Sequence, residues 1–82
     1  MNNLTLIIPA KYESDSLPTV LNEIKSYNCK KKVILELSDT ETIESIKNFD
    51  CEIIFQSQKG YGNALRIGIK SVDTDYLCIF NA

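Results

Sequence analysis

The chain has 82 residues, which is enough for one small domain. Its net charge of −2 gives no electrostatic reason to bind nucleic acid or an anionic membrane surface, and no apolar run approaches the roughly 18 residues of a membrane-spanning helix. A hydrophobic content of 44% and a charged content of 24% are typical of a soluble globular protein. Because Met1-Asn2-Asn3 lacks the basic and apolar regions of a signal peptide, we expect a cytoplasmic protein without a membrane segment.

The first predicted strand covers residues 4–8, an almost continuous apolar run of the kind that is buried on both faces of a sheet. Pro9 is expected to end it, and a polar loop over residues 10–16 follows. Four apolar residues then recur at the spacing of one helix face: Leu17, Val20, Leu21 and Ile24. Ser16 is the expected N-cap of this helix, and Pro18 fits its first turn.

Two further strands are predicted after a polar, basic break over residues 28–32. The second strand covers residues 33–37 and the third covers residues 51–55. Between them we expect a short helix that is capped by Asp39 or Thr40. Its apolar side holds Ile43, Ile46 and Phe49.

All three glycines lie in residues 58–68, a stretch that runs from the end of the third strand into a third predicted helix. Gly60 and Gly62 would let the backbone turn sharply and approach a ligand, and the following helix N-terminus is suited to holding an anion such as a phosphate. The alternative is that these glycines serve turn geometry only. Gly68 is expected to permit close packing of the helix on the sheet. The predicted buried side of the helix holds Ala64, Leu65, Gly68, Ile69 and Val72.

A fourth strand is predicted over residues 76–80, so strands and helices alternate along the chain. This order predicts an α/β fold with a parallel sheet covered by helices, in one of a few doubly wound arrangements.

Polar residues follow each predicted strand. Residues 10–13 come after the first, Ser38-Asp39 after the second, residues 56–62 after the third and Asn81 after the fourth. The carboxyl ends of parallel strands meet at one edge of a sheet, which is where open parallel sheets bind ligands. The sequence therefore predicts a nucleotide-type site at this edge.

The three cysteines, Cys29, Cys51 and Cys78, are far apart in the sequence, and the chain has no histidine. The cysteines do not have the close spacing of zinc ligands, and there is no histidine to complete a site, so we do not expect a zinc site. Cys51 and Cys78 lie beside apolar strand runs, so we expect them to pack as small hydrophobic side chains.

Three segments resemble family 2 glycosyltransferases of the GT-A fold. Residues 7–13 (I-I-P-A-K-Y-E), with Leu17-Pro18, resemble the family opening I-P-A-Y-N-E and L/I-P. Residues 59–68 resemble G-K-G-x-A-L-R-x-G, and residues 75–82 resemble D-Y-V-x-F-L-D-A, the run into the metal-binding D-x-D motif. The chain also resembles the dolichyl-phosphate mannose synthase-like branch of the family, which uses polyprenyl-phosphate acceptors.

The resemblance implies a Rossmann-like half of a GT-A domain with strand order 3-2-1-4. In this order the fourth strand would form an exposed apolar edge, so we expect the isolated chain to self-associate through it or to be poorly stable. It also implies that residues 1–82 are a partial domain, the part that binds a UDP- or GDP-sugar, truncated before the metal motif. Mg²⁺ or Mn²⁺ is expected in the full-length enzyme, which would lie in the cytoplasm or at the cytoplasmic face of a membrane. The isolated chain is expected to be inactive and to hold the metal weakly.

The resemblance gives donor-binding roles to Pro9, Ala10, Tyr12, Glu13, Asp39, Lys59, Gly60, Gly62 and Arg66. Tyr12 would pack on the base or ribose, Glu13 would accept bonds from ribose hydroxyls and Asp39 would read the base edge. Lys59 and Arg66 would meet the diphosphate. The structural alternatives are that Glu13 and Asp39 are helix caps and that Arg66 is a solvated helix residue.

The chain departs from the family pattern in three places. Lys11-Tyr12 replaces the usual Tyr-Asn, and residues 37–42 lack the glycine and first aspartate of D-D-G-S-T-D-x-T. Asn81 stands at the first aspartate of D-x-D and is the one candidate metal ligand.

Two functions of other classes remain as alternatives. One is a non-catalytic nucleotide-binding module that is complete at 82 residues. The other is a flavodoxin- or receiver-like interaction domain. Receivers need acidic residues at the ends of the first and third strands, where this chain has Pro9 and Gln56.

Overall fold

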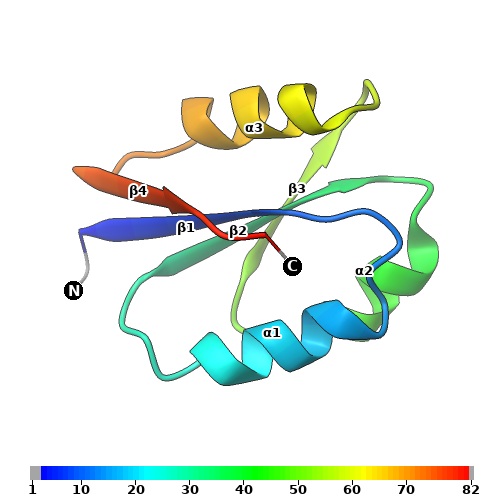
Figure 1. Cartoon of the computed structure of the whole chain (residues 1–82), viewed down its shortest axis with the longest axis horizontal. Helices are drawn as coiled ribbons and strands as arrows, with labels where there is room; N and C mark the ends of the chain where they lie inside the picture. The colour runs from blue at the N-terminus through cyan, green and yellow to red at the C-terminus, as the bar shows by residue number, and fades with distance from the viewer. Residues whose placement is uncertain (1–2, 82) are drawn as a thin grey trace.

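A computed structural model of the chain describes residues 3–81. Met1, Asn2 and Ala82, which entered the signal-peptide argument and the last family motif, lie outside the described residues. Figure 1 shows the alternating elements β1 (Leu4–Pro9), α1 (Ser16–Ile24), β2 (Lys30–Glu36), α2 (Thr40–Ile46), β3 (Glu52–Gln56), α3 (Tyr61–Lys70) and β4 (Tyr76–Ile79). All neighbouring strands are parallel, in the order β3-β2-β1-β4. The predicted α/β class and strand order are confirmed and are consistent with a Rossmann-like, GT-A-type fold.

The sheet has helices on both faces (Figure 1). On one face, strand residues such as Leu6 and Leu35 pack with Leu17 and Leu21 of α1 and with Ile46 of α2. α3 covers the other face, where a smaller cluster contains Ile7, Ile34 and Ala64. Successive strand residues point to opposite faces, so the continuous apolar runs of β1 and β2 supply both clusters. Among the described residues, none of the helices combines the length and the apolar character needed to cross a bilayer.

α3 packs closely on the sheet at Gly68. A Cβ at this position would lie 2.7 Å from Cγ2 of Ile7 and 3.3 Å from Cδ1 of Ile34. The predicted role of Gly68 is therefore confirmed. The prediction was wrong for Ile69, which is exposed. Ala64 and Gly68 face the sheet, and Ile69 is turned away from Gly68 by about 100° of helix rotation.

β2 begins at Lys30, inside the stretch that was predicted to be a polar break. Lys31 and Lys32 are buried strand residues. The Lys31 ammonium donates to the carbonyl of Tyr27 at 2.9 Å, and the Lys32 ammonium donates to the carbonyl of Ser71, just after α3, at 2.5 Å. The break was therefore predicted wrongly, because long lysine stems can lie in a sheet when their ammonium groups reach carbonyl oxygens.

Other element ends differ by a few residues. Pro9 belongs to β1 and is paired with Ile34, and Leu37 lies beyond β2 and is exposed. Ser16 is the first residue of α1 and not its N-cap; its hydroxyl donates to the Glu13 carboxylate. Gly62 lies in the first turn of α3, so the turn itself depends on Gly60.

β4 lies at the edge of the sheet beside β1, as predicted (Figure 1). Its four residues are all exposed, so Cys78 does not pack as a small hydrophobic side chain. Cys51 is half-buried beside the core, as expected. Burial, assisted by the negative charge of Asp50, raises the pKa of the Cys51 thiol.

Candidate functional site

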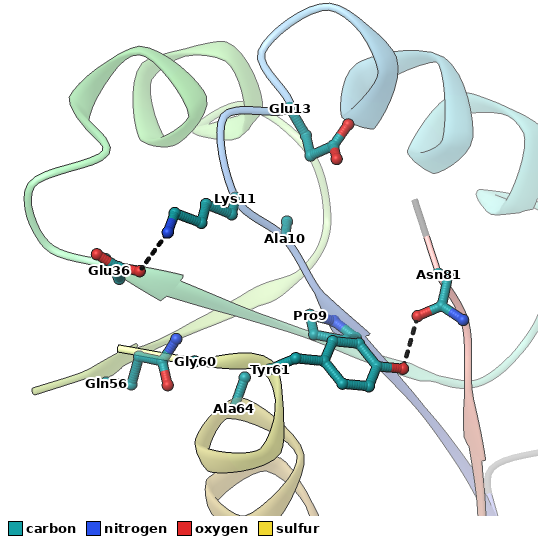
Figure 2. Close-up of a pocket in the computed structure, with 10 residues that line it drawn as sticks. All are labelled: Pro9, Ala10, Lys11, Glu13, Glu36, Gln56, Gly60, Tyr61, Ala64 and Asn81. Carbon is teal, nitrogen blue, oxygen red and sulfur yellow. Dashed lines mark hydrogen bonds and ion pairs between the residues drawn. The ribbon is translucent and has the colours of Figure 1, made fainter. Parts of the chain in front are cut away.

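A pocket lies at the carboxyl ends of the strands (Figure 2). Pro9, Glu36 and Gln56 end β1, β2 and β3, and Asn81 follows β4. The pocket has a volume of about 290 Å³, near the lower end of the range of about 300–1,000 Å³ for small-molecule sites. The lining residues are Pro9, Ala10, Lys11, Glu13, Glu36, Gln56, Gly60, Tyr61, Ala64 and Asn81.

Glu36 and Gln56 bring one acceptor and one donor to the pocket. They are paired in the β2–β3 register, and each is only 8% exposed. Oε2 of Glu36 lies 3.9 Å from Nζ of Lys11 (Figure 2). Oε1 of Gln56 accepts from Nδ2 of Asn63 at 2.8 Å, so its NH₂ group can donate to a ligand. A buried carboxylate beside a buried amide can recognise a flat polar group that offers both an N–H and a carbonyl.

The β3–α3 loop, residues 57–60, borders the pocket through Gly60. This residue has a φ of +115°, a conformation that side-chain-bearing L-residues rarely adopt. It turns the chain from β3 into the first turn of α3, which brings Tyr61 and Ala64 to the pocket. Nδ2 of Asn63 also donates to the carbonyl of Gln58 at 2.9 Å, which ties the loop to the helix.

Tyr61 spans the pocket from α3 toward β4. Its hydroxyl donates to Oδ1 of Asn81 at 2.9 Å (Figure 2). Asn81, the candidate metal ligand, therefore already uses its amide oxygen in a bond. Within residues 3–81 there is no group of three or more His, Cys, Asp or Glu side chains that could hold a metal ion.

The β1–α1 loop, residues 10–15, forms another wall of the pocket and is hydrogen-bonded to α2 and to the residue just before it. The Tyr12 N–H donates to Oδ2 of Asp39 at 2.7 Å, and the Glu13 N–H donates to Oγ1 of Thr42 at 3.1 Å. The Thr42 hydroxyl donates to Oδ1 of Asp39 at 2.9 Å. Asp39 and Thr42 are both buried, and Tyr12 has a φ of +54°.

The residues singled out in the sequence fall into three groups. Pro9, Ala10, Glu13, Gly60 and Asn81 line the pocket. Tyr12 and Asp39 line a neighbouring hollow of about 250 Å³.

The third group, Lys59, Gly62 and Arg66, lines neither space. The Arg66 guanidinium donates to Oδ1 of Asn63 at 2.7 Å, so it acts on the residue that orients Gln56.

Five lining residues were given no individual role: Lys11, Glu36, Gln56, Tyr61 and Ala64. Three of them, Lys11, Gln56 and Tyr61, lie in the segments that were predicted to meet at this edge, whereas Glu36 and Ala64 do not. Glu36 carried a usable signal, since it is a charged residue in an otherwise apolar predicted strand. Gln56 is the first polar residue after the third apolar run. The contribution of Tyr61 depends on the direction of α3, which the sequence pattern does not specify.

A family model described as glycosyl transferase family 2 matches residues 5–82. The match includes every residue that lines the pocket. A search of curated proteins and a search of solved structures both gave no match.

Proposed function

The chain belongs to glycosyl transferase family 2, and we propose that its pocket binds the nucleoside diphosphate of a UDP- or GDP-sugar donor. One observation carries this proposal. Residues from the ends of all four strands and from the first turn of α3 surround a single pocket in the matched region. Ligands of open parallel sheets bind at this edge, where the strand order reverses.

The base would be read by Glu36 and Gln56. Uracil and guanine each have a ring N–H beside a carbonyl oxygen, and these groups match a carboxylate acceptor beside an amide donor. Adenine has the donor and the acceptor exchanged, with an unprotonated ring nitrogen beside an amino group. A base held in the same orientation would therefore face the carboxylate with an acceptor and the amide with a donor. The family resemblance gives base reading to Asp39. We assign it to Glu36, because the Asp39 carboxylate already accepts from Tyr12 and Thr42.

The ribose and diphosphate would lie between the two loops. Glu13 is held at the rim and can accept bonds from ribose hydroxyls. Lys11 supplies a positive charge, and the first turn of α3 supplies N–H groups at the positive end of the helix dipole. Lys59, in the adjoining loop, is a further diphosphate partner, and Arg66 supports Gln56 through Asn63.

A divalent cation would neutralise the departing nucleoside diphosphate in the family reaction. The described residues do not fit a tight site for it, because Asn81 offers one amide oxygen that already accepts from Tyr61. We therefore propose that these residues do not hold Mg²⁺ or Mn²⁺ tightly.

We also propose a polyprenyl phosphate acceptor and a cytoplasmic location. A polyprenyl phosphate acceptor follows from the resemblance to the dolichyl-phosphate mannose synthase-like branch. Its phosphate oxygen is already anionic, so no general base is needed to activate it. A cytoplasmic location fits the three free cysteines, which are usual in a reducing compartment.

Titration calorimetry with UDP, GDP and ADP tests the donor proposal. We expect UDP or GDP to bind more tightly than ADP, with little change when Mg²⁺ is added. Glu36→Gln should weaken the preferred nucleotide about tenfold, because a hydrogen bond to a charged group is lost. Glu23→Gln, on the exposed side of α1, makes the same charge change away from the pocket and should not alter binding. Equal affinities for all three nucleotides would contradict the proposal.

We also propose that the exposed β4 edge mediates self-association. Tyr76, Leu77 and Ile79 are 68%, 41% and 38% exposed, and an unpaired apolar edge is a template for another strand. Light scattering should give a mass above that of the monomer. Ile79→Lys should lower this mass by placing a charge on the edge. A monodisperse wild-type monomer would count against self-association.

A further inference from the structure

We infer that Asp39 and Thr42 are positioning residues that hold the β1–α1 loop in the shape needed for donor binding, an inference that rests on the proposed function. Neither residue lines the pocket. They act on it through two consecutive backbone N–H groups, those of Tyr12 and Glu13.

The held conformation is an unusual one for its sequence. Tyr12 has a φ of +54°, in the left-handed region, which bulky side chains rarely occupy. Its ring is 72% exposed, so packing of the ring contributes little to holding the backbone there. A residue persists in such a conformation only when its surroundings impose it. Here the surroundings are the carboxylate of Asp39 and the hydroxyl of Thr42.

Both acceptors are themselves fixed. Asp39 is 4% exposed and Thr42 is fully buried, and the Thr42 hydroxyl donates to the Asp39 carboxylate at 2.9 Å. The Asp39 side chain makes no capping bond to the backbone of α2, so helix capping does not account for its burial. Its two oxygens serve the loop and Thr42 instead.

The conformation matters to the pocket because of the residues beside Tyr12. Lys11 and Glu13 line the pocket, whereas Tyr12 lines the neighbouring hollow. The Glu13 backbone is held from both sides: its N–H donates to Thr42, and its carbonyl accepts from the Leu17 N–H at 2.9 Å. If Tyr12 returned to an ordinary φ, Lys11 and Glu13 would no longer be presented together.

A double-mutant cycle between residues 42 and 12 tests this inference, using calorimetric titration with whichever of UDP and GDP the wild type binds more tightly. Thr42→Val keeps the side-chain shape but removes the hydroxyl. It should weaken binding about tenfold in the wild type and by less than about threefold in a Tyr12→Gly background, because glycine adopts a positive φ without being held. A loss that is merely structural would be the same in both backgrounds, and that result would overturn the inference.

Two companion variants separate backbone conformation from side-chain contacts. Tyr12→Gly and Tyr12→Val both remove the ring, but valine resists the left-handed region, so the valine variant should bind at least about tenfold more weakly. Equal binding by the two would contradict the inference. Ser45→Ala removes a hydroxyl that bonds only within α2, to the carbonyl of Thr42, and it should leave binding unaltered.

Amide hydrogen exchange reports on the loop without any ligand. Thr42→Val should speed exchange at the N–H groups of Tyr12 and Glu13, and Ser45→Ala should not. Weaker binding by Thr42→Val without faster exchange at these two amides would overturn the positioning role alone. If the wild type binds neither UDP nor GDP, the proposed function fails, and the positioning role is overturned with it.

Discussion

The β1–α1 and β3–α3 loops border the same pocket, and they reach a positive φ in different ways. Within residues 3–81, Tyr12 and Gly60 are the residues with φ in this range. Gly60 has no Cβ, and no atom lies within 4 Å of where one would be. Tyr12 has a bulky side chain and is held by hydrogen bonds from its own N–H and from that of Glu13 to a buried carboxylate and a buried hydroxyl.

The difference shows that an unusual backbone conformation can be intrinsic to a residue or imposed on it. An intrinsic conformation depends on one position, whereas an imposed one depends on distant side chains that must themselves be fixed. We therefore expect the β3–α3 loop to respond to substitution within it and the β1–α1 loop to respond to substitution in α2 or just before it.

The largest expected effect on stability is that of Asp39→Ala. The substitution leaves the Tyr12 N–H and the Thr42 hydroxyl without their acceptor, so unfolding should become easier by about 2–3 kcal/mol. Urea denaturation measures this change. Asp15→Ala, in the loop itself, is the control, because Asp15 is exposed and makes no capping bond; it should change stability by less than about 0.5 kcal/mol. Equal losses of stability for the two variants would mean that the β1–α1 loop does not depend more on Asp39 than on its own residues.

Gly60→Ala should destabilise the chain by about 1–2 kcal/mol, since the φ of +115° is strained for an L-residue. The space around the position is open, so the cost would come from the backbone alone. Chemical synthesis with D-alanine at this position provides the control, because a D-residue accepts a positive φ. Thermal unfolding should show the L-form destabilised and the D-form close to wild type. A destabilised D-form would mean that side-chain space, and not φ, is limiting.

Gly62→Ala should have the smallest effect on stability, and it should stabilise the chain where the other two substitutions destabilise it. Gly62 lies in the first turn of α3 with open space around it, so alanine should stabilise the helix by about 0.5–1 kcal/mol. Thermal unfolding checks the sign. If the variant gains stability but loses nucleotide affinity, the absence of a side chain at this position serves the ligand and not the fold.

Much of the fold could be predicted from the sequence because its signals are local. Apolar runs of strand length alternate with helical spacing, and this alternation is sufficient for a parallel sheet. The start of β2 could not be predicted in this way, because consecutive lysines are typical of loops. Lys31 and Lys32 are buried in the strand because the fold places the carbonyl groups of Tyr27 and Ser71 within reach of their ammonium groups.

The candidate site was predicted less completely, for a related reason. A glycine in the sequence indicates a position that can adopt a positive φ by itself, so Gly60 could be predicted as a turn residue. The conformation of Tyr12 depends on Asp39 and Thr42, which follow a different strand, and no local pattern reports that contact. Glu36 could have been found from its place at the end of an apolar run, but the strand was predicted to continue to Leu37.

The pairing of β4 with β1 has a consequence for the order of folding. Asn3 and Asp75 are 72 positions apart, yet Nδ2 of Asn3 donates to Oδ2 of Asp75 at 2.7 Å beside this pair of strands. Closing so long a loop costs more entropy than pairing β1 with β2 or β2 with β3, which are nearer in sequence. We expect those two pairs to form first and β4 to dock afterwards. β1, the first of the four strands along the chain, would then be the last to gain both of its neighbours.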